Sequence, residues 1–140
     1  MTRILALDVG ERRIGVALSD PLGYTAQPLA VLTRRGGIED VEAVAALVEA
    51  HHVSRVVVGL PLTLRGAVGA SAQRVRSFAG RVGRRIAVPV EFVDERFTTA
   101  ESERVLLAAD ASRRRRKQVI DQMAAQLILQ QYLERNRLAA

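Results

Sequence analysis

The side chains best suited to chemistry are acids that stand at the ends of apolar segments or inside them. Asp8 ends the first apolar run, Asp94 and Glu95 end another, and Asp121 lies in an apolar, alanine-rich stretch. A carboxylate in such a place costs several kcal/mol to desolvate unless it is paired with a cation or bound to a metal ion. An ion pair, for example with Arg13 or Arg96, would make any single one of these acids structural.

Taken together, the four acids point to a metal ion held by oxygen atoms. The chain has no cysteine, and its two histidines, His51 and His52, are adjacent and are expected at a helix end. Carboxylates without sulfur or imidazole ligands form the shell that Mg²⁺ or Mn²⁺ prefers. Two such ions can activate water and stabilise a leaving oxygen, so the acids predict hydrolysis of phosphodiester bonds.

Strand alternation bears on the choice between Asp94 and Glu95, because neighbouring side chains on a strand face opposite sides. Asp94 shares its side with the apolar residues Val90 and Phe92, whereas Glu95 shares its side with Glu91. The pattern favours Asp94 as the partner of the first acid. Both residues remain candidates, because strand ends twist and fray.

Glycines mark two places where a phosphate group could approach the backbone. Gly10 follows Asp8 in a short turn, and a loop containing Gly59, Gly66 and Gly69 leads into the amino end of a predicted helix. Glycine allows close approach, and backbone N–H groups at a helix start can bind phosphate. A plain hairpin turn and an ordinary glycine-rich loop would explain the same residues without a ligand.

Basic residues outnumber acidic ones by 21 to 15, and the net charge of +6 favours a polyanionic partner. Much of the surplus is the run Arg113–Arg116, without which 17 basic residues face 15 acidic ones. The run and Lys117 lead into the helix that carries Asp121, where Lys117 and Asp121 are one turn apart. We therefore expect a mobile loop at Arg113–Arg116 that contacts a nucleic-acid backbone, the alternative being a solvated charge run.

Hydrophobic periodicity predicts a mixed α/β chain. Apolar runs predict a hairpin over residues 3–8 and 14–18 and further strands at 27–32, 56–59 and 88–93. Helical spacing predicts helices over 38–50, from Ser71 through Val82, and over 118–134, with Ser71 as an N-terminal cap. Thr98 and Glu101 have capping-box spacing and predict a short helix to about residue 109.

Length and composition limit the architecture. The chain has 140 residues, 49% hydrophobic and 26% charged, which is typical of a single globular domain over residues 1–140. The longest stretch without charge, residues 21–33, contains two prolines and is shorter than the roughly 20 apolar residues of a spanning helix. Asp8 and Glu11 interrupt the place where a signal peptide would be most apolar. We expect a soluble intracellular protein with no membrane partner.

Four segments of the sequence, taken in order, match one known family. They are Asp8-Val-Gly-Glu-Arg-Arg-Ile-Gly-Val-Ala-Leu-Ser-Asp20, Gly59-Leu-Pro61, Asp94-Glu-Arg-Phe-Thr-Thr99, and Lys117-Gln-Val-Ile-Asp121 with Ala124-Ala125 and Ile128-Leu-Gln-Gln-Tyr-Leu133. Together they closely resemble the YqgF family, also called RuvX, of bacterial RuvC-like proteins put forward as pre-16S rRNA nucleases and earlier as Holliday junction resolvases. The resemblance implies a ribonuclease-H-like α/β fold, with a five-stranded mixed sheet and helices on both faces. It also implies a cytoplasmic nuclease in ribosomal RNA maturation.

The same resemblance implies the site residues. Asp8 and Asp121 match the acids of the first strand and the last helix, and the middle acid comes from Asp94 or Glu95. The set Asp8, Glu95 and Asp121 would hold Mg²⁺ or Mn²⁺. Phosphates would be held by basic residues, namely Arg13, Arg96, Arg113, Arg114, Arg115, Arg116 and Lys117.

The chain departs from RuvC-type resolvases at two positions. Gly59-Leu-Pro61 stands where those proteins have a glutamate at the end of the fourth strand, and Ala124 stands where their last helix carries a second acid. Fewer ligands imply weaker metal binding, or more reliance on substrate phosphate as a ligand.

Three functions stay open at this point. The first is a metal-dependent endonuclease on structured RNA, and the second is the same chemistry on branched DNA, as in a Holliday junction resolvase. The third is a binding protein on RNA or the transcription machinery that keeps the fold without cutting. A resolvase must cut two strands symmetrically, which calls for a dimer. We expect a monomer or a weak homodimer, so the oligomeric state helps to distinguish a resolvase from an RNA nuclease.

Overall fold

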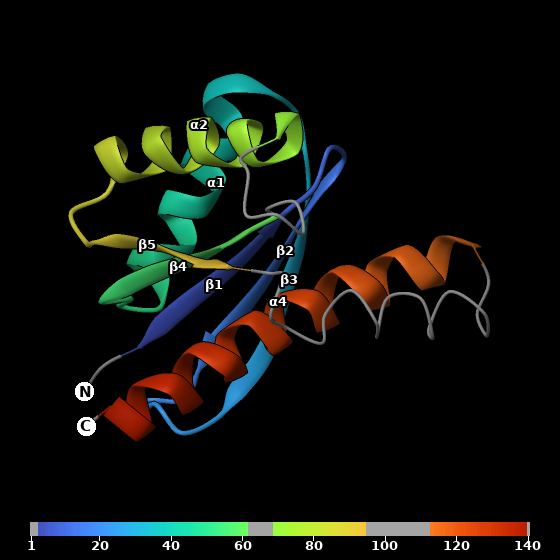
Figure 1. The fold of residues 1–140 in the computed structure, drawn as a ribbon. Helices are drawn as coiled ribbons and strands as arrows, with labels where there is room; N and C mark the ends of the chain where they lie inside the picture. The colour runs from blue at the N-terminus through green and yellow to red at the C-terminus, as the bar shows by residue number, and fades with distance from the viewer. Residues whose placement is uncertain (1–2, 62–68, 95–112, 140) are drawn as a thin grey trace.

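The computed structural model of the chain describes residues 3–61, 69–94 and 113–139 (Figure 1). Within the last of these segments, side chains are described for residues 123–136. The elements in chain order are β1 (Ile4–Val9), β2 (Arg13–Ser19), β3 (Ala26–Thr33), α1 (Gly37–Ala50), β4 (Arg55–Leu60), α2 (Ala70–Arg85), β5 (Val90–Asp94) and α4 (Arg113–Ala139).

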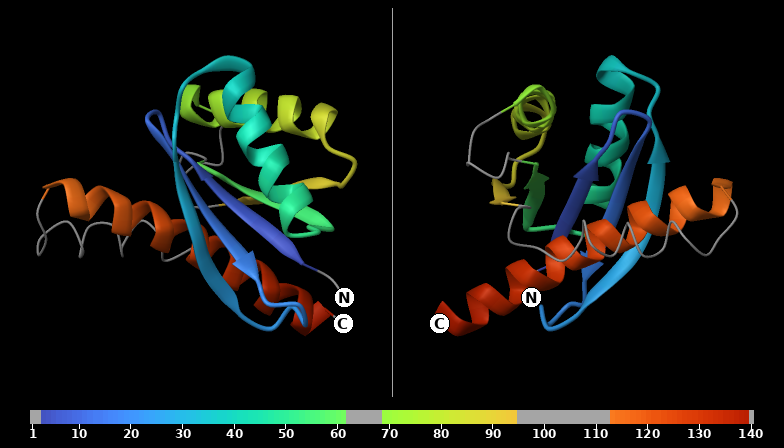
Figure 2. Two further views of the ribbon diagram at one scale, coloured as in Figure 1. Left: turned by 180° about the vertical axis from the view of Figure 1, so that it is seen from behind. Right: turned by 45° about the vertical axis from the view of Figure 1, so that its right-hand side comes forward.

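The five strands form one mixed sheet in the order β3-β2-β1-β4-β5. β1 pairs antiparallel with β2, and β2 with β3, whereas β1, β4 and β5 run parallel. Helices α1 and α2 lie on one face of the sheet, and α4 crosses the other (Figures 1 and 2). The predicted fold class is confirmed, and β1 at the centre is buried on both faces.

The face under α1 and α2 is held by large apolar side chains. Helical spacing brings Val41, Val44 and Val48 of α1 onto the sheet, and Phe78 and Val82 of α2 join them. Apolar residues at this spacing form one continuous stripe on a helix, so the sequence pattern predicts these contacts directly. The predicted core positions of both helices are confirmed.

The strands under α4 contribute several alanines to the core. Ala6, Ala17 and Ala26 of the sheet pack with Ala125 and Ile128 of α4. Alanine side chains allow the helix backbone to lie close to the strands, since little volume separates them. Within the described residues, no helix is both long and apolar enough to cross a lipid bilayer.

Hydrogen bonds among Tyr132, Arg55 and Glu91 connect α4 to the sheet. The Tyr132 hydroxyl accepts a hydrogen bond from Arg55 Nη1 of β4 at 2.7 Å and donates one to Glu91 Oε2 of β5 at 2.8 Å. Arg55 Nη1 also lies 3.4 Å from Glu91 Oε1. Tyr132 is itself buried, as expected of a core residue rather than a base-stacking platform.

Two element starts differ from the sequence prediction. α2 begins at Ala70 after Gly69, and Ser71 makes no cap; its hydroxyl instead accepts a hydrogen bond from Arg74 Nη2 at 3.3 Å. β5 begins at Val90 rather than Val88, because Pro89 has no N–H to give to the ladder. The helix predicted from Thr98 to residue 109 lies outside the described residues.

The largest correction concerns Arg113–Arg116. These residues form the first turn of α4 instead of the predicted loop, so the helix begins earlier than residue 118. Arginine is among the stronger helix formers, and no proline or glycine separates the run from the helix that follows. Charge repulsion along the run is therefore outweighed by helix propensity and by continuity with α4.

Candidate functional site

Asp8 is a buried acid near the end of the central strand. It is 8% exposed and pairs across the β1–β2 ladder with Gly15. In the described part of the chain, the other buried polar side chains are Ser19 and Asp40, and both have structural roles. Ser19 Oγ accepts a hydrogen bond from the Ile4 N–H at 2.9 Å, and Asp40 holds the start of α1.

The face on which Asp8 lies follows from its neighbours. Ile4 and Ala6 belong to the cluster packed under α4, and Leu5 and Leu7 belong to the cluster under α1 and α2. Because strand side chains alternate between faces, Asp8 shares the α4 face. It stands at the carboxyl edge of the three parallel strands.

Asp94 is on the opposite face from Asp8. Val93 belongs to the α4 cluster, and Val90 packs against the other one. Alternation therefore places the partly buried Asp94 on the side of Val90. Both sides of the strand meet apolar residues, so an apolar neighbour does not identify the face, and the choice between Asp94 and Glu95 stays a prediction.

The remaining middle-acid candidate is Glu95, which lies outside the described residues together with Arg96. Position 95 has the same parity as Val93 and Glu91, the residue that binds Tyr132 of α4. The sequence prediction for Glu95 therefore stays a prediction.

Asp121 falls within α4, one helical turn before Ala125. The described part of that helix buries Ala124, Ala125 and Ile128 against the sheet. Position 121 is thus in helical register with the buried stripe, although its side chain is beyond those the structure describes. Lys117 is one further turn toward the start of α4.

The turn after Asp8 is closed by a direct backbone contact. Gly10 N–H donates to the Arg13 carbonyl at 2.8 Å, and a Cβ at Gly10 would lie 3.0 Å from that same oxygen. Glycine is therefore favoured here, because any Cβ would crowd the Arg13 carbonyl. Because the Gly10 N–H is already used, it is not available to hold a phosphate.

Of the other candidate phosphate-binding glycines, two lie in described parts of the chain. Gly59 is buried inside β4, paired with Val93, and Gly69 is the residue before α2. Gly66 lies outside the described residues. Arg13, at the start of β2, is half-buried beside the turn.

The described side chains contain no group of three His, Cys, Asp or Glu residues close enough to hold a metal ion. Asp8 offers the hard oxygen ligand that Mg²⁺ and Mn²⁺ prefer, and its burial on the α4 face fits such a role. The other two acids of the predicted set lie at positions whose side chains the structure does not describe.

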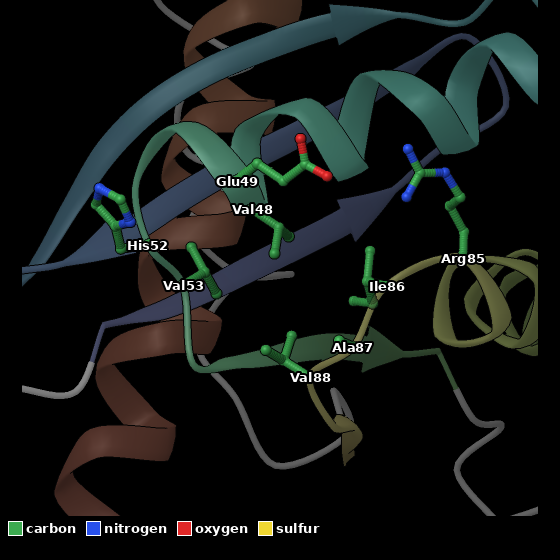
Figure 3. Close-up of a pocket in the computed structure, with 8 residues that line it drawn as sticks. All are labelled: Val48, Glu49, His52, Val53, Arg85, Ile86, Ala87 and Val88. Atoms are coloured by element: carbon green, nitrogen blue, oxygen red, sulfur yellow. The ribbon is translucent and has the colours of Figure 1, made fainter.

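A separate pocket of about 420 Å³ lies at the other end of the sheet, between the end of α1 and the segment that leads into β5 (Figure 3). Val48, Val53 and Val88 line it, with Glu49 and His52 at its rim. It contains none of the predicted site residues. The chemistry predicted from the sequence is therefore not associated with this pocket.

Comparisons with solved structures define the class of the fold. Thermus thermophilus RuvC in complex with a Holliday junction substrate superposes with a TM-score of 0.60 at 15% identity, covering 100% of this chain and 98% of that one. The Fowlpox virus resolvase with its Holliday junction DNA gives a TM-score of 0.56 at 12% identity, covering 96% and 99%. The fold is that of RuvC-type, ribonuclease-H-like proteins.

Comparisons of sequence identify the family. The family described as RuvX, Holliday junction resolvase, matches residues 2–135. A Moorella thermoacetica protein whose name describes it as a candidate pre-16S rRNA nuclease is 53% identical over 133 residues, or 95% of each chain. A protein of the same name from Pelotomaculum thermopropionicum is 51% identical over 133 residues, covering 94% of this chain and 86% of that one. The chain belongs to the RuvX family.

Proposed function

We propose that this protein is a metal-dependent endonuclease that cuts precursor 16S ribosomal RNA in the cytoplasm and takes part in processing its 5′ end. The observation that carries the proposal is the buried carboxylate of Asp8 at the carboxyl edge of the central strand, on the face crossed by α4. The names of relatives more than 50% identical over nearly the whole chain support the substrate.

Three acids supply the metal ligands in this proposal. Asp8 contributes the first, Asp121 of α4 the second and Glu95 the third. Asp94 is set aside because strand alternation places it on the other face of the sheet. Bound Mg²⁺ or Mn²⁺ would activate water and stabilise the leaving oxygen of a phosphodiester.

Basic residues on two elements would hold the substrate backbone. Arg13 begins β2 beside the Asp8 turn, and Arg113–Arg116 with Lys117 form the first turns of α4. Arg96 completes the predicted set.

A second candidate function is resolution of Holliday junctions, which the description of the matching family favours. The same acids would serve both reactions, and the difference lies in the substrate. Symmetric cutting of a junction calls for two active sites in a dimer, whereas cutting one RNA strand needs only a monomer. Oligomeric state in solution therefore separates the two functions.

The test is incubation of the purified protein with precursor 16S rRNA, a four-way DNA junction and unstructured single strands, each with and without Mg²⁺ or Mn²⁺. We expect cation-dependent cleavage of the precursor RNA. Faster cleavage of the junction by a dimer would establish the resolvase instead. Tight RNA binding without cleavage under any of these conditions would identify a non-cleaving binding protein and contradict both.

A further inference from the structure

Arg34 connects the turn after Asp8 to both helices on the far face of the sheet. It follows the last residue of β3, and its Nη1 donates a hydrogen bond to the Gly10 carbonyl at 3.0 Å. Its own backbone N–H donates to the Arg12 carbonyl at 2.8 Å. Two carbonyls of the same turn are thus held by one residue.

The guanidinium group is fixed on its other sides as well. Arg34 Nε donates to Asp40 Oδ2 at 3.2 Å, and Arg34 Cζ lies 5.0 Å from the centre of the Phe78 ring in α2. The Arg34 side chain is 21% exposed and that of Asp40 only 4%. A planar guanidinium that is paired, hydrogen-bonded and stacked has little freedom to rotate.

Asp40 is anchored in turn at the start of α1. Its carboxylate accepts the N–H of Arg35 at 2.8 Å and the N–H of Gly36 at 3.1 Å. Burial by itself would raise the pKa of Asp40, but these backbone hydrogen bonds and the Arg34 guanidinium lower it below its usual value. The carboxylate is therefore ionised and gives Arg34 a fixed counter-charge.

We infer that Arg34 is a positioning residue for Asp8. The inference rests on the proposed nuclease function and adds to it. The turn that Arg34 holds begins directly after the strand residues Asp8 and Val9, so a shift of the Gly10 carbonyl displaces the end of β1. A catalytic group displaced by about 1 Å can lose on the order of 100-fold in rate, and rigid supporting contacts prevent such displacement.

Nothing in the residue types around Arg34 marked it in the sequence. It is one of 20 arginines, and its partners Gly10, Asp40 and Phe78 come from three separate segments. The contact exists only because the order β3-β2-β1 brings the end of β3 beside the β1–β2 turn.

Arg34→Lys is the decisive variant, because it keeps a positive charge beside Asp40 but loses the planar fork that reaches Gly10 and Asp40 together. We expect kcat for RNA cleavage to fall about 10- to 100-fold, with KM changed by less than about threefold because Arg34 does not touch substrate. Arg34→Ala should behave likewise, and added guanidinium ion should restore part of its kcat.

A second readout needs neither metal nor substrate. Amide hydrogen exchange at Gly10 reports the Gly10–Arg13 hydrogen bond, and we expect faster exchange there in Arg34→Lys while circular dichroism stays unchanged. Arg85→Ala is the matched control, since Arg85 forms an exposed ion pair with Glu42 at 2.8 Å on the same face. It should alter neither kcat nor exchange at Gly10.

The possible results test the positioning role of Arg34 and the proposed nuclease function separately. If the wild type cleaves and Arg34→Lys keeps both its kcat and its exchange rate at Gly10, the positioning role is overturned. A rise in KM equal to the loss of kcat/KM would also overturn it, since it would mean that Arg34 binds substrate. If the wild type cleaves nothing, the proposed nuclease function fails and the catalytic part of this inference fails with it, while the exchange measurement still decides whether Arg34 holds the turn.

Discussion

The two faces of the sheet are built in different ways. Under α1 and α2, large side chains such as Leu7, Val44 and Phe78 form a continuous apolar cluster. Under α4, alanines occupy three strand positions of the cluster, and hydrogen bonds among Tyr132, Arg55 and Glu91 connect the helix to the sheet. Asp8, the buried acid of the proposed site, is on this second face.

The face that supplies most of the folding free energy is not the face that carries the candidate catalytic acid. Apolar burial supplies most of the free energy of folding, and it is concentrated under α1 and α2. The α4 face has smaller apolar side chains, and its polar contacts fix the position of one helix with directional bonds. An acid can therefore be carried on that face while the opposite cluster maintains the fold.

Removing the largest buried ring should give the largest loss of stability. Phe78 is 1% exposed in the α1–α2 cluster, and we expect Phe78→Ala to lower the free energy of unfolding by about 3–5 kcal/mol. Urea denaturation followed by circular dichroism measures this. Phe92→Ala is the control, because Phe92 is 43% exposed on the edge strand β5. Equal effects of the two variants would show that burial in this cluster does not determine the loss of stability.

On the α4 face, loss of one hydroxyl should have a smaller effect. Tyr132→Phe removes both hydrogen bonds of the Tyr132 oxygen while Arg55 and Glu91 remain paired. We expect a loss of about 1–2 kcal/mol in the free energy of unfolding. Tyr24→Phe, at a ring 59% exposed in the β2–β3 turn, should change it by less than about 0.5 kcal/mol. A neutral Tyr132→Phe would show that apolar packing alone holds α4.

The smallest expected effect is a pH dependence of stability that comes from Asp40 in α1. The pKa of Asp40 is lower in the folded chain than its usual value, since hydrogen bonds from Arg35, Arg34 and Gly36 outweigh the effect of burial. Stability from this carboxylate is therefore present above the unfolded pKa of about 3.9 and is lost as pH falls through the folded value.

Melting temperatures of the wild type and Asp40→Asn across this acid range test the assignment. The two curves should differ most at neutral pH and converge in acid. Asp20 and Glu42 also have lowered pKa values, through hydrogen bonds from Thr25 and Arg85 respectively, so the variant keeps a residual acid dependence. Parallel curves would show that Asp40 contributes nothing to the pH dependence of stability.

The sequence predicts the sheet and the core helices well, because period and composition are local properties. The apolar stripe of α1 and the buried run Val56-Val57-Val58 are examples. The sequence prediction was wrong where two opposing effects compete. At Arg113–Arg116 a loop was predicted from charge, but helix propensity outweighs charge repulsion and the residues are helical. For Asp94, parity tells which residues share a face but not which helix covers that face, so the sequence alone could not relate this residue to Asp8.

In the candidate site, too, some residues could be predicted from local sequence and others depend on the fold. Asp8 could be predicted from its type and its place at the end of an apolar run, and its burial on the α4 face agrees with that prediction. Arg34 could not, because its contacts join Gly10, Asp40 and Phe78 through the order of strands and helices. Glu95, Arg96 and Gly66 lie outside the described residues and stay predictions.

The most direct test of the account is the cleavage rate of Asp8→Asn on precursor 16S rRNA at saturating Mg²⁺ or Mn²⁺, measured beside its melting temperature. We expect cleavage below about one hundredth of wild type, because an amide replaces a carboxylate metal ligand, and an equal or higher melting temperature, because repulsion among neighbouring carboxylates falls. Asp94→Asn, on the other face, should cleave at close to the wild-type rate. Cleavage by Asp8→Asn above about one tenth of wild type, or loss of activity in Asp94→Asn instead, would contradict it.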